Sequence, residues 1–109
     1  MKSKVKLPSN VKIAHVTYWI VPMTELEVEQ KVAYGSYLAN DCIIKIDVTR
    51  DLQIVRDTLL HEIGHGIFQW YDIKDEDDEE RTICKYSTGL TQVFLDNPKV
   101  ARFLTKASK

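Results

Sequence analysis

The stretch Thr58–Phe68, TLLHEIGHGIF, places two histidines and a glutamate within an otherwise apolar segment that has helical spacing. Residues four apart lie one above the other on a helix, so His61 and His65 can hold one metal ion together. Two imidazoles suit zinc, and a catalytic zinc site also needs a third protein ligand and an open position for water. Glu62 lies beside the first histidine, where it can accept a proton from that water. The spacing predicts a zinc site of the hydrolytic kind.

Two glycines lie within the same helix, although each costs roughly 1 kcal/mol there relative to alanine. For Gly64 and Gly66 we expect close approach of a ligand or of a neighbouring helix to offset that cost. Simple packing is the alternative explanation.

The segments around this helix predict an α+β fold. The helix begins near Thr49 or Asp51, either of which can cap it, and ends near Trp70. Residues 11–20 are rich in β-branched and aromatic residues and predict one strand, ended by Pro22.

Two further β-like runs, KVAYGSYL and CIIKIDV, flank a turn at Ala39-Asn40-Asp41. Residues 24–30 fit either a short helix or a connection. We therefore expect a small antiparallel or mixed sheet of about three strands packed on the helix that carries the histidines.

A second, antiparallel helix is predicted to begin near Glu76, inside an acidic run, and to continue through Phe94. Its apolar stripe is expected to be Ile83, Ser87, Leu90 and Phe94. It ends before Asn97-Pro98, where proline suits the first position of a short C-terminal helix. The side chains Val100, Phe103 and Leu104 are expected to dock that last helix on the core.

No histidine follows His65, so the third ligand must be of another type. The remaining histidine, His15, falls on the first predicted strand and is interpreted as structural or surface. A carboxylate downstream is the best candidate, and Cys84 is a weaker one. A residue about four positions into a helix that begins near Glu76 would lie level with the histidines.

This geometry selects Glu79 or Glu80, and helix phase favours Glu80, which shares the face of the expected stripe. Acids at the start of a helix normally act as caps and as partners of the helix dipole. We interpret most of residues 72–80, which hold seven acids and one lysine, in that way.

Composition predicts one domain over residues 1–109, with residues 1–10 as a flexible basic tail. The net charge of −1 favours neither nucleic acid nor an anionic membrane as a partner. No run of about 18 apolar residues and no signal peptide is evident. With two cysteines only, Cys42 and Cys84, a cytoplasmic setting is expected.

Over residues 34–104 the chain resembles small gluzincin-type zinc metallopeptidases of the kind carried by phages, related to the ImmA/IrrE-like group. The motif DTLLHEIGHGIF carries the resemblance, together with EERTICKYSTGL, which matches the group's Glu-x-x-Ala-Asn-x-Phe-Ala-Ala-x-Leu helix when read from Glu80. Ile83 and Cys84 replace the Ala-Asn pair. The resemblance implies a zincin-like fold in which an edge strand, expected at residues 41–47, lies along the site, where a substrate could add as a further strand.

Together these features predict a zinc metallopeptidase that binds one Zn²⁺ per chain and acts on a peptide or protein. His61, His65 and Glu80 would bind the metal, and Glu62 would be the general base. Tyr71 or Tyr86 would donate to the oxyanion. The alternative is a zinc-binding protein of the same fold without peptidase activity, with Cys84 as a fourth ligand. The sequence leaves the oligomeric state open.

Overall fold

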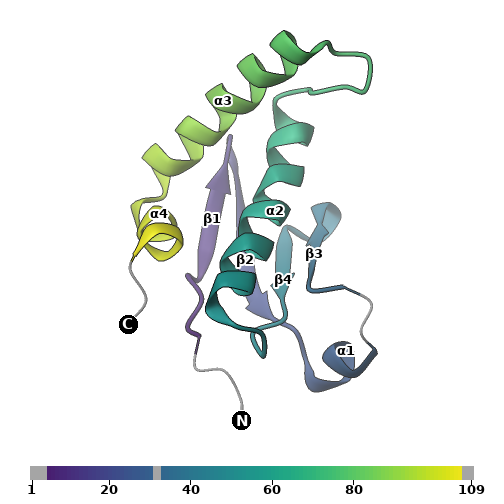
Figure 1. Ribbon diagram of the computed structural model, residues 1–109, viewed down its shortest axis with the longest axis vertical. Coiled ribbons are helices and arrows are strands. Elements are labelled where there is room, and N and C mark those ends of the chain that lie inside the picture. Colours follow the sequence, from purple (N-terminus) through teal and green to yellow (C-terminus); the bar gives the residue numbers. More distant parts are fainter. Residues whose placement is uncertain (1–4, 31–32, 107–109) are drawn as a thin grey trace.

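The computed structural model describes residues 5–30 and 33–106 (Figure 1). Over these residues the chain forms an α+β unit with one four-stranded sheet, four α-helices and a 3-10 turn at Ala39–Asp41. The elements, in chain order, are β1 (Asn10–Ile13), β2 (Val16–Pro22), α1 (Glu25–Gln30), β3 (Gly35–Leu38), β4 (Ile43–Ile46), α2 (Leu52–Trp70), α3 (Glu79–Asp96) and α4 (Pro98–Thr105).

The single strand expected over residues 11–20 is wrong, because this segment forms the hairpin of β1 and β2. The two strands pair antiparallel, with Ile13 opposite Val16. Ala14 adopts φ 58°, the left-handed conformation that a tight two-residue turn requires. His15 therefore lies in the turn rather than on a strand. Alanine is not a typical turn residue, so the run of β-like residues gives no sign of the turn at Ala14.

The sheet has the order β1-β2-β4-β3 and is mixed, since β2 and β4 run parallel whereas the outer pairs are antiparallel. The predicted hairpin of β3 and β4 is confirmed. The expectation that residues 41–47 form the edge strand is wrong: β4 inserts between β2 and β3, so β3 is the edge. The chain can make this parallel pairing because α1 and β3 lie between the two strands in sequence.

The core lies between the sheet and α2, which crosses one face of the strands (Figure 1). Alternate strand residues point at the helix, as the two-residue period of a strand requires. The buried apolar residues are Val11, Ile13, Tyr18, Ile20, Ile44, Ile46, Val55, Leu59, Ile63, Ile67, Val93 and Val100. Trp19 points to the other face of the sheet and is 54% exposed.

The predicted helix over Leu52–Trp70 is confirmed, and so is the end of α3 before Asn97-Pro98. In α4, Val100 is buried, with Phe103 and Leu104 packed against the core. Buried Asn97 joins α3 and α4 to β1, since its side-chain amide donates to the carbonyl of Lys12 and accepts from its N–H.

Two expectations at helix and chain ends are corrected. The second helix begins at Glu79 rather than near Glu76, because Asp78 accepts a hydrogen bond from the Arg81 N–H at 2.8 Å and caps it. Residues 5–10 are not a free tail, since Val5 and Leu7 pack against the core. Residues 1–4 of that expected tail lie outside the described residues. Within the described chain, no helix combines the length and apolarity needed to cross a bilayer.

Candidate functional site

Helix α2 presents the motif residues on two different sides. Ile63 and Ile67 face the sheet and are buried, whereas His61 and His65 are exposed. Their ring centroids lie 4.9 Å apart with planes at 83°, one ring meeting the other edge-on. The helix therefore brings the two imidazoles together on one face, as their four-residue spacing predicts.

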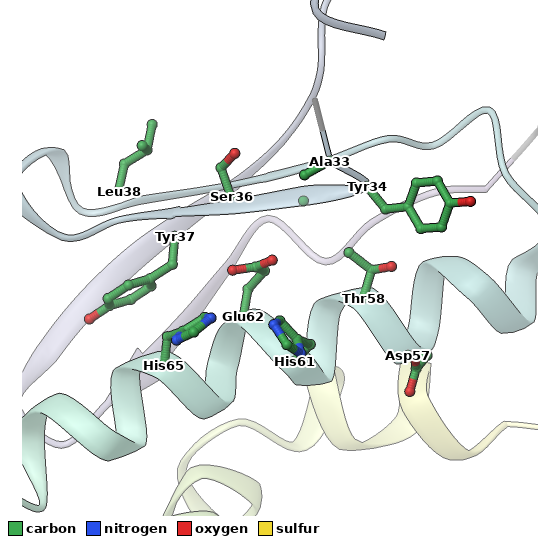
Figure 2. Close-up of a pocket in the computed structure, with 11 residues that line it drawn as sticks. Ala33, Tyr34, Ser36, Tyr37, Leu38, Asp57, Thr58, His61, Glu62 and His65 are labelled. Carbon is green, nitrogen blue, oxygen red and sulfur yellow. The ribbon is translucent and has the colours of Figure 1, made fainter. Parts of the chain in front are cut away.

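Glu62 lies between α2 and the edge strand β3, and its side chain points toward the strand (Figure 2). It is only 5% exposed. Burial raises the pKa of its carboxyl above the ordinary value, while the neighbouring His65 and His61 act in the opposite direction. Within the described part of the chain, no donor hydrogen-bonds to this carboxylate. Its oxygens open into the space between β3 and α2 rather than being sealed in the core, and a partly desolvated carboxylate that faces a cleft is a candidate functional group.

Strand β3 comes close to α2 at Gly35. A Cβ atom at this position would lie 2.6 Å from Thr58 Cγ2 and 2.9 Å from Glu62 Oε2. A larger residue fits only if the Thr58 and Glu62 side chains turn away or the strand moves. The absence of a side chain at Gly35 therefore lets the strand backbone approach the glutamate.

The register of β3 shows which of its backbone groups are free. The Asp47 N–H donates to the Tyr34 carbonyl at 2.8 Å, so this pair is hydrogen-bonded, and bonded pairs recur at every second residue of an antiparallel ladder. Ser36 and Leu38 consequently point their backbone groups at β4. The N–H and C=O groups of Gly35 and Tyr37 point outward, at the edge that borders the histidines.

The side chain of Tyr37 lies against His65, with ring centroids 6.1 Å apart and planes at 26° (Figure 2). Its hydroxyl donates to Gln69 Oε1 at 2.6 Å and meets the Tyr18 hydroxyl at 2.8 Å. The Trp70 indole N–H in turn donates to Tyr18 at 2.6 Å. Burial and the Tyr18 hydroxyl raise the pKa of Tyr37 far above its usual range, so the hydroxyl stays protonated. This network holds the ring beside His65.

Two hollows meet at the histidines. The first, of about 680 Å³, lies between β3 and α2 and contains Glu62 (Figure 2). The second, of about 540 Å³, lies between α2 and α3. His61 and His65 line both. From α2 the second hollow is also lined by Gly64 and Phe68, and from α3 by Thr82, Ile83, Tyr86 and Ser87.

The predicted inward stripe of α3 is confirmed at Leu90 and Phe94, which pack against the core, and is wrong at Ile83 and Ser87. Ile83 is 52% exposed and Ser87 is exposed, whereas Gly89 and Val93 are buried. Besides Leu90 and Phe94, the inward face comprises Thr82, Tyr86, Gly89 and Val93, which recur at helical spacing. Gly89 permits the closest approach, since a Cβ there would lie 2.7 Å from Ile67 Cγ2. Glycine carries no hydrophobic signal, so the apolar pattern does not reveal Gly89 as a packing position. The predicted inward face therefore differs from the observed one.

The two candidate glutamates lie on different sides of α3. Glu79 precedes Thr82 and Tyr86 by three and seven residues and so shares their side of the helix, whereas Glu80 shares the side of Ile83 and Ser87. Both glutamates are exposed. Glu80 instead accepts a hydrogen bond from the Cys84 thiol at 3.5 Å, on an exposed part of the helix. That contact raises the pKa of Cys84.

The structure does not bring a third ligand to the histidines. Over residues 5–30 and 33–106, no three His, Cys, Asp or Glu side chains are placed to hold one metal ion. Because α3 begins three residues later than expected, the position level with the histidines is occupied by Thr82 and Ile83, and both glutamates precede the hollow. His61, His65 and Glu62 lie together; Glu80 and Cys84 are not part of that group.

The two glycines of α2 have different roles. At Gly66 a Cβ would lie 2.6 Å from Ile13 Cδ1, so this glycine serves the packing of α2 on β1. At Gly64 a Cβ would lie 3.4 Å from the Tyr86 hydroxyl. Gly64 therefore keeps open the second hollow, beside the histidines.

The structure separates the two tyrosines considered as oxyanion donors. Tyr86 lines the second hollow with the histidines. Tyr71 packs inward against Gly89 and lines neither hollow. His15 stacks edge-on against Trp70, with centroids 4.8 Å apart, and stays outside the site. Gly35 and Tyr37 were missed as site residues, although a glycine inside a short strand is a signal of close backbone approach.

Comparisons with known proteins add nothing to this geometry. No protein-family model, curated protein or solved structure matches the chain.

Proposed function

We propose that the protein is a zinc-dependent peptidase of zincin-like architecture that hydrolyses peptide bonds at the junction of the two hollows. The observation that carries this proposal is the juxtaposition of two adjacent imidazoles with a carboxylate that is 5% exposed and has no hydrogen-bond donor among the described residues. A structural zinc site has no use for such a carboxylate, because its ligands fill every coordination position.

The donor set fits zinc in type, since two histidines on one helical face are common zinc ligands. His61 and His65 would hold the ion, with a third ligand from the first turn of α3. For that ligand the inward register supports Glu79, and the resemblance to the ImmA/IrrE-like group supports Glu80. When bound, zinc would polarise the scissile carbonyl and lower the pKa of water to roughly 7.

Glu62 is suited to take the proton from the attacking water and pass it to the leaving amine. Burial raises the pKa of its carboxyl, which makes the carboxylate a stronger base, and general bases work best with a pKa near the working pH. The Tyr86 hydroxyl, in the adjoining hollow, is the group we assign to the developing oxyanion.

The edge of β3 supports a peptide as the substrate. The outward N–H and C=O groups of Gly35 and Tyr37 can pair with an extended backbone, as when a strand adds to a sheet. A peptide held there passes over Glu62 and beside both histidines, because these side chains line the same hollow (Figure 2).

The test compares wild type with Glu62→Gln and His61→Ala, measuring zinc per chain by atomic absorption and cleavage of an unfolded protein by mass spectrometry. Glu62→Gln should retain one zinc and lose cleavage by about 100-fold or more. His61→Ala should lose both. Cleavage by Glu62→Gln at the wild-type rate, or wild-type protein that binds no zinc, would refute the proposal.

A further inference from the structure

The first hollow, between β3 and α2, has an end that the proposed chemistry does not use. Figure 2 shows Asp57, Thr58 and Tyr34 at this end, whereas His65 lies toward the other. Asp57 precedes His61 by four residues on α2, so its side chain lies on the same side of the helix as the two histidines. The hollow therefore continues along α2, past the proposed metal ligands, to an aspartate.

The Asp57 carboxylate is exposed and has no ion pair or hydrogen bond with any residue that the structure describes. Its neighbour Arg56 donates instead to the carbonyl of Phe103 on α4. Among the described residues, Asp57 is also not placed to share a metal ion with the two histidines. Its charge at this end of the hollow is therefore not offset by an ion-pair partner.

Thr58 brings a second oxygen to the same place. The residue is only 8% exposed, yet its hydroxyl forms no hydrogen bond within residues 5–30 and 33–106. The oxygen is not sealed in the core, and Figure 2 shows it turned toward Tyr34. Because polar groups in buried residues normally have a hydrogen-bond partner, this hydroxyl is suited to accept a hydrogen bond from a ligand in the hollow.

The ring of Tyr34 borders this end of the hollow and attracts cations. The guanidinium carbon of Arg50 lies 4.5 Å from the ring centroid, a cation–π distance. The charge of Arg50 is itself offset by the buried carboxylate of Asp47, whose Oδ2 lies 3.5 Å from Arg50 Nε. A carboxylate, a hydroxyl acceptor and an aromatic ring together favour a positively charged group.

The alignment of β3 with α2 sets where such a group would lie on a bound peptide. The strand and the helix run in the same direction, since Gly35 lies against Thr58 and Tyr37 against His65. Asp57 lies four residues, or about 6 Å along the helix axis, before the first histidine. An extended peptide advances about 3.3 Å per residue. Asp57 is therefore about two residues away from a peptide bond held at that histidine.

We propose that Asp57, Thr58 and Tyr34 form a subsite for a positively charged group of the substrate, about two residues from the cleaved bond. The group is a lysine or arginine side chain or the N-terminal ammonium of a short peptide. This assignment rests on the proposed peptidase function. Asp57 attracts the charge, the Thr58 hydroxyl accepts a hydrogen bond, and the Tyr34 ring covers the apolar stem of the side chain.

The first experiment measures binding without cleavage. Glu62→Gln protein in zinc-containing buffer is titrated with labelled peptides of otherwise neutral sequence, and fluorescence anisotropy reports the affinity. The peptides are one with blocked ends and a single lysine, the same peptide with norleucine instead, and the norleucine peptide with a free N-terminus.

At least one of the two cationic peptides should bind about fivefold more tightly than the neutral one, and the difference should shrink at high salt. The peptide that binds more tightly identifies the source of the cation. Equal affinities for all three peptides would overturn the proposal.

A second experiment changes the charge of the subsite. Asp57→Asn should abolish the preference for the cationic peptide, and Asp57→Lys should reverse it in favour of a peptide that carries glutamate. The matched control is Asp51→Asn, which removes the same charge just before α2, outside the hollow, and keeps a capping residue there. This control should keep the preference. Retention in Asp57→Asn, or equal loss in Asp51→Asn, would reject the subsite.

The two proposals fail in different ways. Wild-type protein that binds zinc, prefers the cationic peptide through Asp57 and cleaves nothing would refute the peptidase and support the subsite. Cleavage with no enrichment of lysine, arginine or a free N-terminus near the cut would refute the subsite and support the peptidase.

Discussion

Tyr37 and His65 lie face to face across the boundary between the edge strand and the helix, with ring centroids 6.1 Å apart and planes at 26°. The contact couples β3, the strand proposed to bind an extended backbone, to a proposed metal ligand on α2. The hydroxyl of the same tyrosine is hydrogen-bonded to Tyr18 and Gln69, and these bonds fix the orientation of the ring. An imidazole whose orientation is set before the metal arrives should bind it more tightly.

Substitutions at Tyr37 separate its ring from its hydroxyl. Tyr37→Phe keeps the ring against His65 and should retain zinc affinity, while it lowers the free energy of unfolding by about 1–3 kcal/mol through lost hydrogen bonds. Tyr37→Leu removes the stacked ring and should lower zinc affinity as well. Competition with a chelator measures the affinity and urea unfolding the stability. Equal zinc affinities for the two variants would show that the ring does not orient His65.

Gly35 should tolerate no side chain. In Gly35→Ala the added Cβ would lie 2.6 Å from Thr58 Cγ2 and 2.9 Å from Glu62 Oε2, so either these side chains must turn away or β3 must move away from α2. We expect unfolding free energy to fall by about 1–3 kcal/mol, as for other overpacked sites. Ser36→Ala, on the next residue of the same strand but with its side chain on the opposite face, is the control and should change stability little. Similar thermal unfolding of both variants would contradict the close approach.

The raised pKa of Glu62 makes the stability of the metal-free protein depend on pH. A carboxyl whose pKa is raised by folding favours the folded state fully below its ordinary value of 4.5, and this contribution is lost as pH rises through the raised pKa. Glu62→Gln removes the titration. The stability of wild type relative to Glu62→Gln should therefore fall as pH rises from about 4 to neutrality. Urea unfolding with a chelator present, over this pH range, measures the difference. If the difference in unfolding free energy between the two proteins stays constant over this pH range, burial does not raise the pKa of Glu62.

The third metal ligand can be identified by paired variants. On the inward register of α3, Glu79→Gln should lower zinc affinity by tenfold or more, whereas Glu80→Gln should leave it near wild type. The two changes are chemically identical and adjacent, so each is the control for the other. Zinc per chain and chelator competition give the readout. Loss of zinc in Glu80→Gln alone would restore the assignment made from the sequence, and retention in both would place the ligand elsewhere.

The sequence was sufficient for features that depend on local spacing. The four-residue interval of His61 and His65 puts both rings on one face of any helix, and the apolar repeat from Val55 to Ile67 requires that helix to bury its opposite side in the core. The end of α3 at Asn97-Pro98 follows from the same local rules. These patterns need no knowledge of distant residues.

Tertiary structure decided what depends on contacts between distant segments. The strand order makes β3 rather than β4 the edge strand. The close approach of β3 to α2 at Gly35, which covers Glu62, also depends on this tertiary arrangement. The direction in which α3 faces also had to come from packing, since Gly89 provides the closest contact and carries no hydrophobic signal. A hydrophobic pattern records which residues avoid water, but it cannot specify which neighbour they meet, because burial against any apolar partner is almost equally favourable.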